Sequence, residues 1–228
     1  MKKQTILLAV IGIIFLLSAC QQEDSSDIPA AGYLVLDEIA AVFPEVSQVE
    51  GRAVDADFYV TLASAASTTT YNPGNFPTGK LPLEPGSYTI TVENAAYRNN
   101  TANAPKFYYT GTFTIEAEKI NYLQVQVPMV NFAVSFVLPA DFTTYFDAPT
   151  FQVTASYTSG RTDQTVTMYT QRAPQYFDYE QGVRLNFALT AVNKDSEAVS
   201  LSGSHTEILP GKCYAVTYSL PAGLSVSD

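Results

Sequence analysis

The chain has 228 residues, of which 46% are hydrophobic and 15% charged, and its formal charge is −10. This length and hydrophobicity suffice for one or two packed domains, so disorder as the overall state is excluded. The acidic balance argues against nucleic acid as a partner, because phosphates are bound mainly by Lys and Arg. One His and two Cys leave little material for zinc-dependent or Ser-His-Asp chemistry.

The first residues have the layout of a secretory signal, in which two lysines precede an apolar run over 6–17 and small residues follow. The run is shorter than the roughly 20 apolar residues of a membrane-spanning helix, and nothing later in the chain is of that kind. Its end, Leu17-Ser18-Ala19-Cys20, resembles the bacterial lipobox. The resemblance implies a signal peptide over 1–19, cleavage between Ala19 and Cys20, and acylation of Cys20 with fatty acids such as palmitate. The alternative is an ordinary signal peptide with a chance cysteine.

Residues 20–31 are predicted to form an acidic, flexible tether between the acylated Cys20 and the folded part of the chain. The stretch Gln21-Gln22-Glu23-Asp24 and the serines after it resemble the lipoprotein export signal of Bacteroidota-type bacteria. That resemblance implies an outer-membrane lipoprotein, attached through its acyl chains and exposed on the cell surface. A solvated linker is the plain alternative. With Cys20 acylated, Cys213 has no partner for an intramolecular disulfide.

From Gly32 onward, apolar residues recur with a period of two, which is typical of half-buried strands. Turn residues separate these segments, so we expect an all-β fold of antiparallel sandwiches. The expected strands cover 32–39, 58–63, 88–93, 113–115, 123–127, 132–138, 151–157, 183–189 and 214–220.

Val127-Pro128-Met129 is the expected boundary, because a proline between two strand patterns cannot donate to a sheet. It divides the chain into an N-terminal sandwich over 32–127 and a C-terminal sandwich over 129–222, with a tail over 223–228. Helix signals are nearly absent. The exception is a single turn within 139–146, which Asp141 could cap.

A Pro-Gly turn that leads into a strand with a tyrosine occurs twice, at 83–91 with Tyr88 and at 209–217 with Tyr214. Each phenol can hydrogen-bond to nearby backbone while its ring packs inward. The repetition suggests two related sandwiches, although a motif this short could recur by chance.

Several blocks occur together in one order: the lipobox, Gly32-Tyr33-Leu34-Val35-Leu36, the strand at 58–62, the turn at 83–90, the stretch 107–115 and Tyr176-Phe177. In this order they resemble an uncharacterised family of tandem β-sandwich surface lipoproteins of Bacteroidota-type bacteria. That family has a domain of unknown function and is allied to the fimbrillin-like adhesins. The resemblance implies immunoglobulin-like or transthyretin-like sandwiches and an adhesin-like or fimbria-associated protein that is not an enzyme. Its implied partners are a host or bacterial surface protein, a glycan, or fimbrial subunits.

Fimbrillin-like subunits can be matured by an arginine-directed protease that releases the first strand, so that a neighbour's strand fills the groove. Arg52, within Gly51-Arg52-Ala53, lies between the first two expected strands, where such a cut would fall. The alternative is an exposed loop arginine.

Two groups of side chains could in principle carry chemistry. Cys213 and His205 are close in sequence, but strand parity places the thiol opposite the apolar face of its strand, which favours a small surface or edge residue. Asp55 and Asp57 lack the ligand pattern of a calcium loop, so they are expected to be solvated loop acids. We expect no catalytic residue, no metal and no cofactor.

Two long segments are the expected binding loops: 64–79 with Tyr71 and Phe76, and 94–105 with Tyr97 and Arg98. Their rings could contact a sugar or a protein, or could pack as lids over the sandwich. The alternative function that these loops suggest is a carbohydrate-binding accessory lipoprotein of an outer-membrane nutrient-uptake system.

Overall fold

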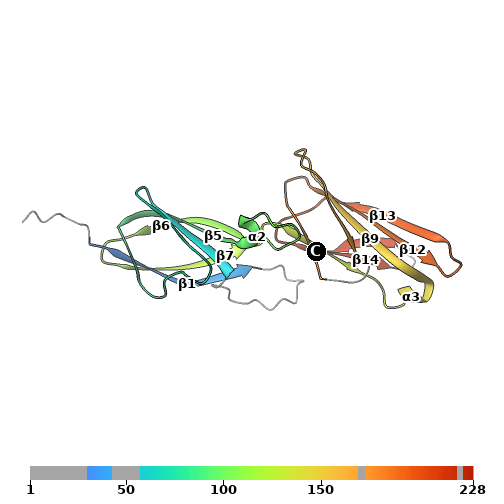
Figure 1. Cartoon of the computed structure of the whole chain (residues 1–228), viewed down its shortest axis with the longest axis horizontal. Coiled ribbons are helices and arrows are strands. Elements are labelled where there is room, and N and C mark those ends of the chain that lie inside the picture. Colours follow the sequence, from blue (N-terminus) through green and yellow to red (C-terminus); the bar gives the residue numbers. More distant parts are fainter. Residues whose placement is uncertain (1–29, 43–56, 169–172, 220–222, 228) are drawn as a thin grey trace, which may run out of the picture. The chain divides into compact units, whose positions relative to one another are not determined.

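The computed structural model describes residues 30–42, 57–168, 173–219 and 223–227, and these form strands almost throughout (Figure 1). Among them, no helix is long and apolar enough to cross a bilayer. The first half contains β1 (Gly32–Val42), β2 (Phe58–Ala63), β3 (Thr68–Tyr71), β4 (Leu81–Leu83), β5 (Gly86–Asn94), the one-turn helix α2 (Ala95–Arg98), β6 (Tyr108–Ile115) and β7 (Ile120–Pro128).

The second half continues with another set of strands and one short helical turn. These are β8 (Phe132–Val137), α3 (Phe142–Tyr145), β9 (Phe146–Ser156), β10 (Gln164–Met168), β11 (Gln175–Phe177), β12 (Arg184–Asn193), β13 (Ala198–His205), β14 (Cys213–Ser219) and β15 (Gly223–Ser227).

Each half is a sandwich of two sheets, as the alternating pattern predicts. The first half has sheets ordered β4-β1-β7 and β3-β2-β5-β6, and the second has β11-β8-β14-β15 and β10-β9-β12-β13. Neighbouring strands are antiparallel except for one pair in each sandwich: β1 runs parallel to β7, and β8 runs parallel to β14. The all-β sandwich prediction is confirmed, with a parallel pair that the sequence pattern does not predict.

The two sandwiches repeat one strand order. Adding seven to each strand number of the first sandwich gives the strand order of the second, so that β1 corresponds to β8 and β7 to β14. The pairings and strand directions are the same, and the second sandwich has one extra strand, β15. The repeated Pro-Gly-Tyr motif does not mark equivalent positions in this repeat. Tyr88 lies on β5, whose counterpart is β12, whereas Tyr214 lies on β14, whose counterpart is β7.

Both motif tyrosines do bond to nearby backbone, as expected. The Tyr88 hydroxyl donates to the carbonyl oxygen of Glu84 at 3.0 Å. The Tyr214 hydroxyl donates to the Glu207 carbonyl at 3.1 Å and accepts from the Leu209 amide at 2.8 Å. Each ring is buried, so these bonds satisfy a polar group that would otherwise be costly in the interior.

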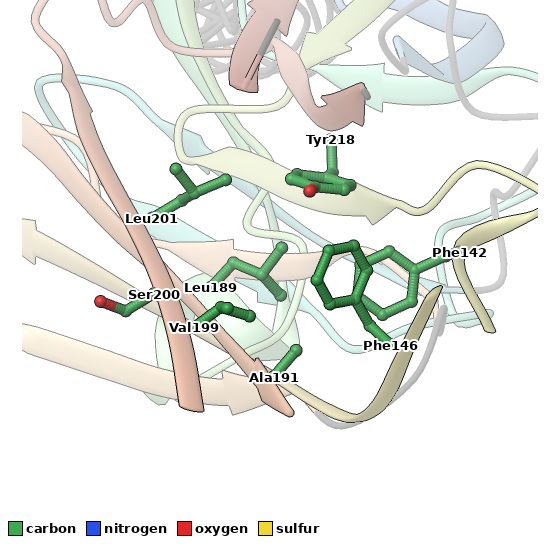
Figure 2. Close-up of a pocket in the computed structure, with 8 residues that line it drawn as sticks. All are labelled: Phe142, Phe146, Leu189, Ala191, Val199, Ser200, Leu201 and Tyr218. Atoms are coloured by element: carbon green, nitrogen blue, oxygen red, sulfur yellow. The ribbon is translucent and has the colours of Figure 1, made fainter. Parts of the chain in front are cut away.

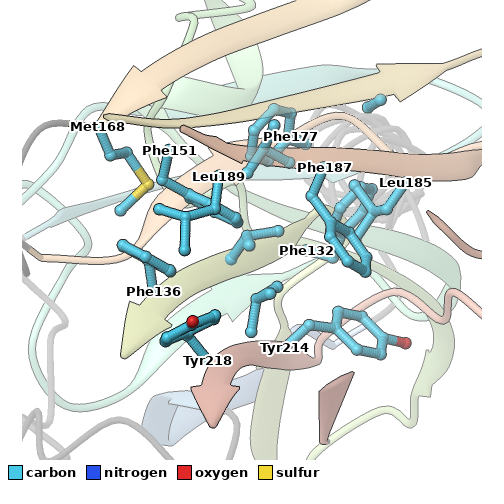
Figure 3. Packing of buried hydrophobic residues seen from close by; sticks show 14 of the residues in the cluster. Phe132, Phe136, Phe151, Met168, Phe177, Leu185, Phe187, Leu189, Tyr214 and Tyr218 are labelled. Carbon is cyan, nitrogen blue, oxygen red and sulfur yellow. The ribbon is translucent and has the colours of Figure 1, made fainter. Parts of the chain in front are cut away.

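The strands bury alternate side chains between the sheets of each sandwich, and the buried side chains form two clusters. One is built from residues between Leu34 and Met129, and the other from residues between Phe132 and Tyr218. In the second cluster, rings from opposite sheets meet: Phe136 stacks on Phe151 with ring centroids 4.0 Å apart (Figure 3). Burying one such side chain contributes roughly 1.5–3 kcal/mol.

The structure differs from the sequence expectations at short and polar elements. β3 lies inside the segment expected to be a loop, and β15 lies inside the segment expected to be a tail. Both lie at the edge of a sheet. β3 carries little apolar periodicity, because three of its four side chains are exposed. The single turn after Asp141 forms, but the Asp141 side chain makes no capping hydrogen bond.

Candidate binding site

Several predicted site residues lie outside the described residues. These are Ala19 and Cys20 of the lipobox and Arg52 of the maturation site. Lipidation, signal cleavage and maturation cleavage therefore stay predictions.

Tyr71 and Phe76 lie together at the edge of the first sandwich. Their rings meet edge to face with centroids 4.9 Å apart, and both pack against the N-terminal core cluster. Tyr71 is on β3 opposite Val60, so the sheet sets its place. Each ring is half-buried, which makes this pair a cover for the core. A binding role for the pair stays a prediction.

The segment that carries Tyr97 and Arg98 is held by one asparagine. Asn94 begins α2, and its Oδ1 accepts from the amides of Tyr97 at 3.0 Å and Phe107 at 3.1 Å. Its Nδ2 donates to the Pro105 carbonyl at 2.8 Å. The side chain thus ties both ends of the connection between β5 and β6, which gives Tyr97 and Arg98 fixed positions.

Tyr97 and Arg98 each rest on a tyrosine of the neighbouring sheet. The Tyr97 ring stacks on Tyr108 with centroids 4.5 Å apart. The Arg98 guanidinium lies 4.4 Å from the centre of the Tyr59 ring and pairs with Glu93 at 3.6 Å. Burial, with smaller contributions from Tyr108 and Glu93, raises the pKa of Tyr97. Tyr97 is therefore a neutral, rigidly backed ring at neutral pH.

Tyr97 also lines a pocket of about 470 Å³. Side chains from both halves of the chain contribute to it, and we call it the Lys106 pocket after its buried cation. Its lining residues are Tyr97, Asn100, Lys106, Val130, Asn131, Arg161, Asp178 and Tyr179.

A network of ion pairs and hydrogen bonds crosses the Lys106 pocket. Lys106 Nζ donates to Asp178 Oδ1 and, at 2.6 Å, to Asn100 Oδ1. Arg161 Nη2 donates to the other oxygen of Asp178. Asn131 Oδ1 accepts from the Lys106 amide at 2.9 Å. Lys106, Asn131 and Asp178 are all buried, and the charges of Lys106 and Asp178 are tolerated there because they are paired.

Two further side chains form hydrogen bonds to the backbone of Asp178. Gln164 Oε1 accepts from the Asp178 amide at 2.8 Å, and the Tyr157 hydroxyl donates to the Asp178 carbonyl at 3.0 Å. Burial raises the pKa of Tyr157 to about 12; the Arg161 charge opposes that rise, and neighbouring carboxylates add to it. The phenol therefore stays protonated and keeps its donor role over the physiological range.

This arrangement is suited to binding a small polar molecule. It combines two tyrosine rings with donors and acceptors that are already held in place, and placed polar groups of this kind fix the orientation of a bound molecule. Among the predicted binding residues, only Tyr97 lines it. The charged and amide groups come from four separate segments between strands, so no local sequence motif predicts that they lie together.

A second pocket, of about 350 Å³, lies in the C-terminal sandwich and is mostly apolar. Phe142 and Phe146 flank it on one side and Tyr218 on another, opposite Leu189 and Val199 (Figure 2). Part of this lining belongs to the core cluster itself. The pocket is thus an opening at the margin of the core, and Ser200 and Tyr218 are the lining residues with a hydroxyl group.

The Cys213 and His205 pair is not assembled. The sequence expectation that Cys213 is a small surface or edge residue is wrong, because it is 3% exposed. Parity correctly places it opposite Tyr214, but that side of β14 is also covered at this end, where Ala133 opposite Cys213 is buried too. The His205 ring contacts Tyr214 instead, at 5.4 Å between centroids. Burial raises the pKa of the Cys213 thiol, which disfavours the reactive thiolate.

Within the described part of the chain, no three His, Cys, Asp or Glu side chains gather as metal ligands would. Asp57 is exposed at the entrance to β2, and Asp55 lies outside the described residues.

Comparison with known proteins gives the chain a family. Curated proteins yield no match. Similar solved structures include a candidate adhesin from Bacteroides ovatus, with 10% identity, a TM-score of 0.47, and coverage of 87% of this chain and 93% of that one. A candidate cell adhesion protein from Bacteroides uniformis has 11% identity, a TM-score of 0.44 and coverage of 86% and 95%. A fimbrilin from Porphyromonas gingivalis has 8% identity, a TM-score of 0.41 and coverage of 86% and 94%. A family model described as a domain of unknown function, DUF4493, matches residues 31–226, and the chain belongs to this family.

Proposed function

We propose that this protein is a lipid-anchored binding protein of the adhesin type, displayed on the outer membrane and without catalytic activity. The observation that carries the proposal is the order of segments: the lipobox ending at Cys20 comes first, then an acidic tether, then an all-β body that starts at Gly32. A fully extended tether over 20–31 reaches about 40 Å at most, which keeps the body near the membrane.

The contents of the body support binding over catalysis. The Lys106 pocket offers fixed donors, acceptors and tyrosine rings. The His205 ring contacts Tyr214, whereas the Cys213 thiol lies on the other side of β14, so the two do not form a catalytic pair.

The anchor is tested by labelling cells with an alkyne analogue of palmitate and separating membrane from soluble protein. We expect label and membrane retention in the native chain, and loss of both in Cys20→Ala. Cys213→Ala is the matched control and should keep both. Protease treatment of intact cells then tests display, because an exposed body is digested without lysis. Retention of Cys20→Ala in the membrane would refute the anchor, and protection from protease would refute surface display.

In one version of this proposal, the protein is an accessory subunit of a fimbria. Its support is the position of Arg52 between β1 and β2, where cleavage would release a strand for exchange between subunits. Strand-exchanged polymers resist SDS, so unheated protein should run as a ladder that collapses on boiling, and Arg52→Ala should abolish the ladder. A monomer in the unheated sample would remove the fimbrial form and leave the anchored adhesin.

The second candidate function is a carbohydrate-binding accessory lipoprotein of a nutrient-uptake system. The Lys106 pocket favours it, because tyrosine rings beside fixed polar groups suit a sugar ring and its hydroxyls. Glycan binding that is lost in Tyr97→Ala, while the Tm is kept, would support this function. Binding that persists would remove Tyr97 from the site.

A further inference from the structure

We propose that the Lys106 pocket binds a sugar residue that carries a carboxylate or a sulfate group, an inference that rests on the proposed surface-binding function. The first evidence is the set of charges that line the pocket. Two cations, Lys106 and Arg161, face a single carboxylate, Asp178, so the lining has a positive excess within a chain whose formal charge is −10. An acidic group is the ligand feature that such a local excess selects.

The hydrogen bonds of the two cations leave donors for a ligand. Lys106 Nζ has three N–H groups, and Asp178 and Asn100 accept two of them. Arg161 has five N–H groups, donates to Asp178 through Nη2, and has a side chain that is 40% exposed. The guanidinium can therefore hold Asp178 and still donate to a second acidic group at the mouth of the pocket.

Two other carboxylates lie near Tyr157 but do not line the pocket. Glu180 accepts from the backbone and hydroxyl groups of Thr158 and Ser159, at 2.6 to 3.0 Å. Asp163 accepts from the Ser156 hydroxyl at 2.8 Å and from the Tyr157 amide at 3.3 Å. Both are engaged by the turn after β9, so Asp178 is the carboxylate that a ligand in the pocket meets.

The remaining lining favours a sugar over a bare anion. Tyr97 and Tyr179 offer ring surface, and the Tyr97 ring is held by its stack on Tyr108. Asn100 and Asp178 add acceptors beside the cationic donors, so a matching ligand both donates and accepts, as sugar hydroxyls do. A volume of about 470 Å³ suits a small ligand of this kind. Because hydrogen bonds within the protein hold Lys106, Asn100 and Asn131 in place, little ordering is needed on binding.

The test uses the full protein, extracted from cells with mild detergent, and titration calorimetry with defined probes. The probes are trigalacturonate, its trimethyl ester as a neutral match, a sulfated chondroitin disaccharide, sodium sulfate alone, and acetylated triglutamate. We expect the carboxylate or the sulfated sugar to bind about tenfold or more tightly than the ester, because a charge-assisted hydrogen bond is lost in the ester. Which of the two binds tighter identifies the acidic group.

The matched variants separate the pocket from general charge effects. Arg161→Gln should weaken binding of the acidic sugar about tenfold, and Arg161→Lys should weaken it less. Lys194→Gln removes the same charge at an exposed pair with Asp147 and should leave binding unchanged. A thermal melt of each variant checks that the fold is kept.

Several outcomes would overturn the inference. Equal affinity for the ester would exclude an acidic sugar. Equal affinity for sodium sulfate or triglutamate would exclude a sugar. No binding by any probe, or equal weakening by Arg161→Gln and Lys194→Gln, would exclude the pocket. None of these outcomes alters the palmitate labelling or protease exposure, so the surface-anchoring proposal fails or stands separately.

Discussion

Asp178 is the carboxylate that both cations of the Lys106 pocket share, and its replacement by asparagine should be severely destabilising. The Lys106 side chain is 8% exposed and that of Asp178 is 12% exposed. Asp178→Asn keeps the shape of the side chain but removes its charge, so a buried ammonium is left with Asn100 as its main partner. Breaking a buried pair on one side costs about 3–5 kcal/mol.

This loss is large against the whole stability of a domain, which is about 5–15 kcal/mol. It is measured by urea unfolding followed by circular dichroism, because the chain has no Trp and an intrinsic tryptophan signal is lacking. Glu116→Gln is the control, because it breaks the ion pair of Glu116 with Lys119. The side chains of these two residues are 57% and 64% exposed, respectively. An exposed pair of this kind contributes less than about 1 kcal/mol.

The double variant Lys106→Met/Asp178→Leu separates the two parts of the argument. Removing both charges should recover much of the loss, because the cost comes from an unpaired buried charge and not from the missing attraction. If Asp178→Asn lowered the free energy of unfolding no more than Glu116→Gln does, the Lys106–Asp178 pair would behave as an exposed pair and the reasoning would be refuted.

Three further predictions concern single side chains. Tyr214→Phe loses two backbone hydrogen bonds and should lower the free energy of unfolding by about 1–3 kcal/mol, more than Tyr88→Phe, which loses one; equal losses in urea would contradict this. Hydrogen bonds from Ser159 and Thr158 lower the pKa of Glu180 from 4.5, so its stabilisation is present above that pH and is lost as the pH falls through the lowered value. A series of Tm values below pH 5 should therefore be flatter for Glu180→Gln, and parallel curves would count against the idea. The buried Cys213 thiol should react with DTNB only as the protein unfolds, and rapid labelling of the native protein would show that it is accessible.

The period-two pattern predicts the long strands because each has one face in a core. In β2, every second residue from Phe58 to Leu62 is buried, and the sequence alternates accordingly. The pattern fails for β3, β10 and β13, which lie at sheet edges and have mostly exposed or half-buried side chains. Their position comes from pairing with a neighbouring strand, which a local pattern does not contain. The same holds for the parallel pairing of β1 with β7.

The site was less predictable than the fold for a related reason. Tyr97 could be expected from a long loop with aromatic residues, but Lys106, Arg161 and Asp178 meet only after distant connections come together. Cys213 shows that the alternation of a strand does not by itself predict burial. The period says which face of a strand a residue occupies, and only the tertiary structure says whether that face is covered.

The repeated strand order separates what holds the fold from what could recognise a ligand. Both sandwiches use the same strand order, whereas the residues that line the Lys106 pocket lie in the connections: 95–107, 129–131, 157–163 and 178–183. Loops on a rigid framework can vary without loss of the core, and this is where binding residues concentrate. Asp178 belongs to both functions, because it neutralises a buried lysine and also lines the pocket. Loss of binding in Asp178→Asn would therefore be ambiguous. The Arg161 side chain is 40% exposed, far more than that of Lys106, so Arg161→Gln is the substitution that better separates recognition from stability.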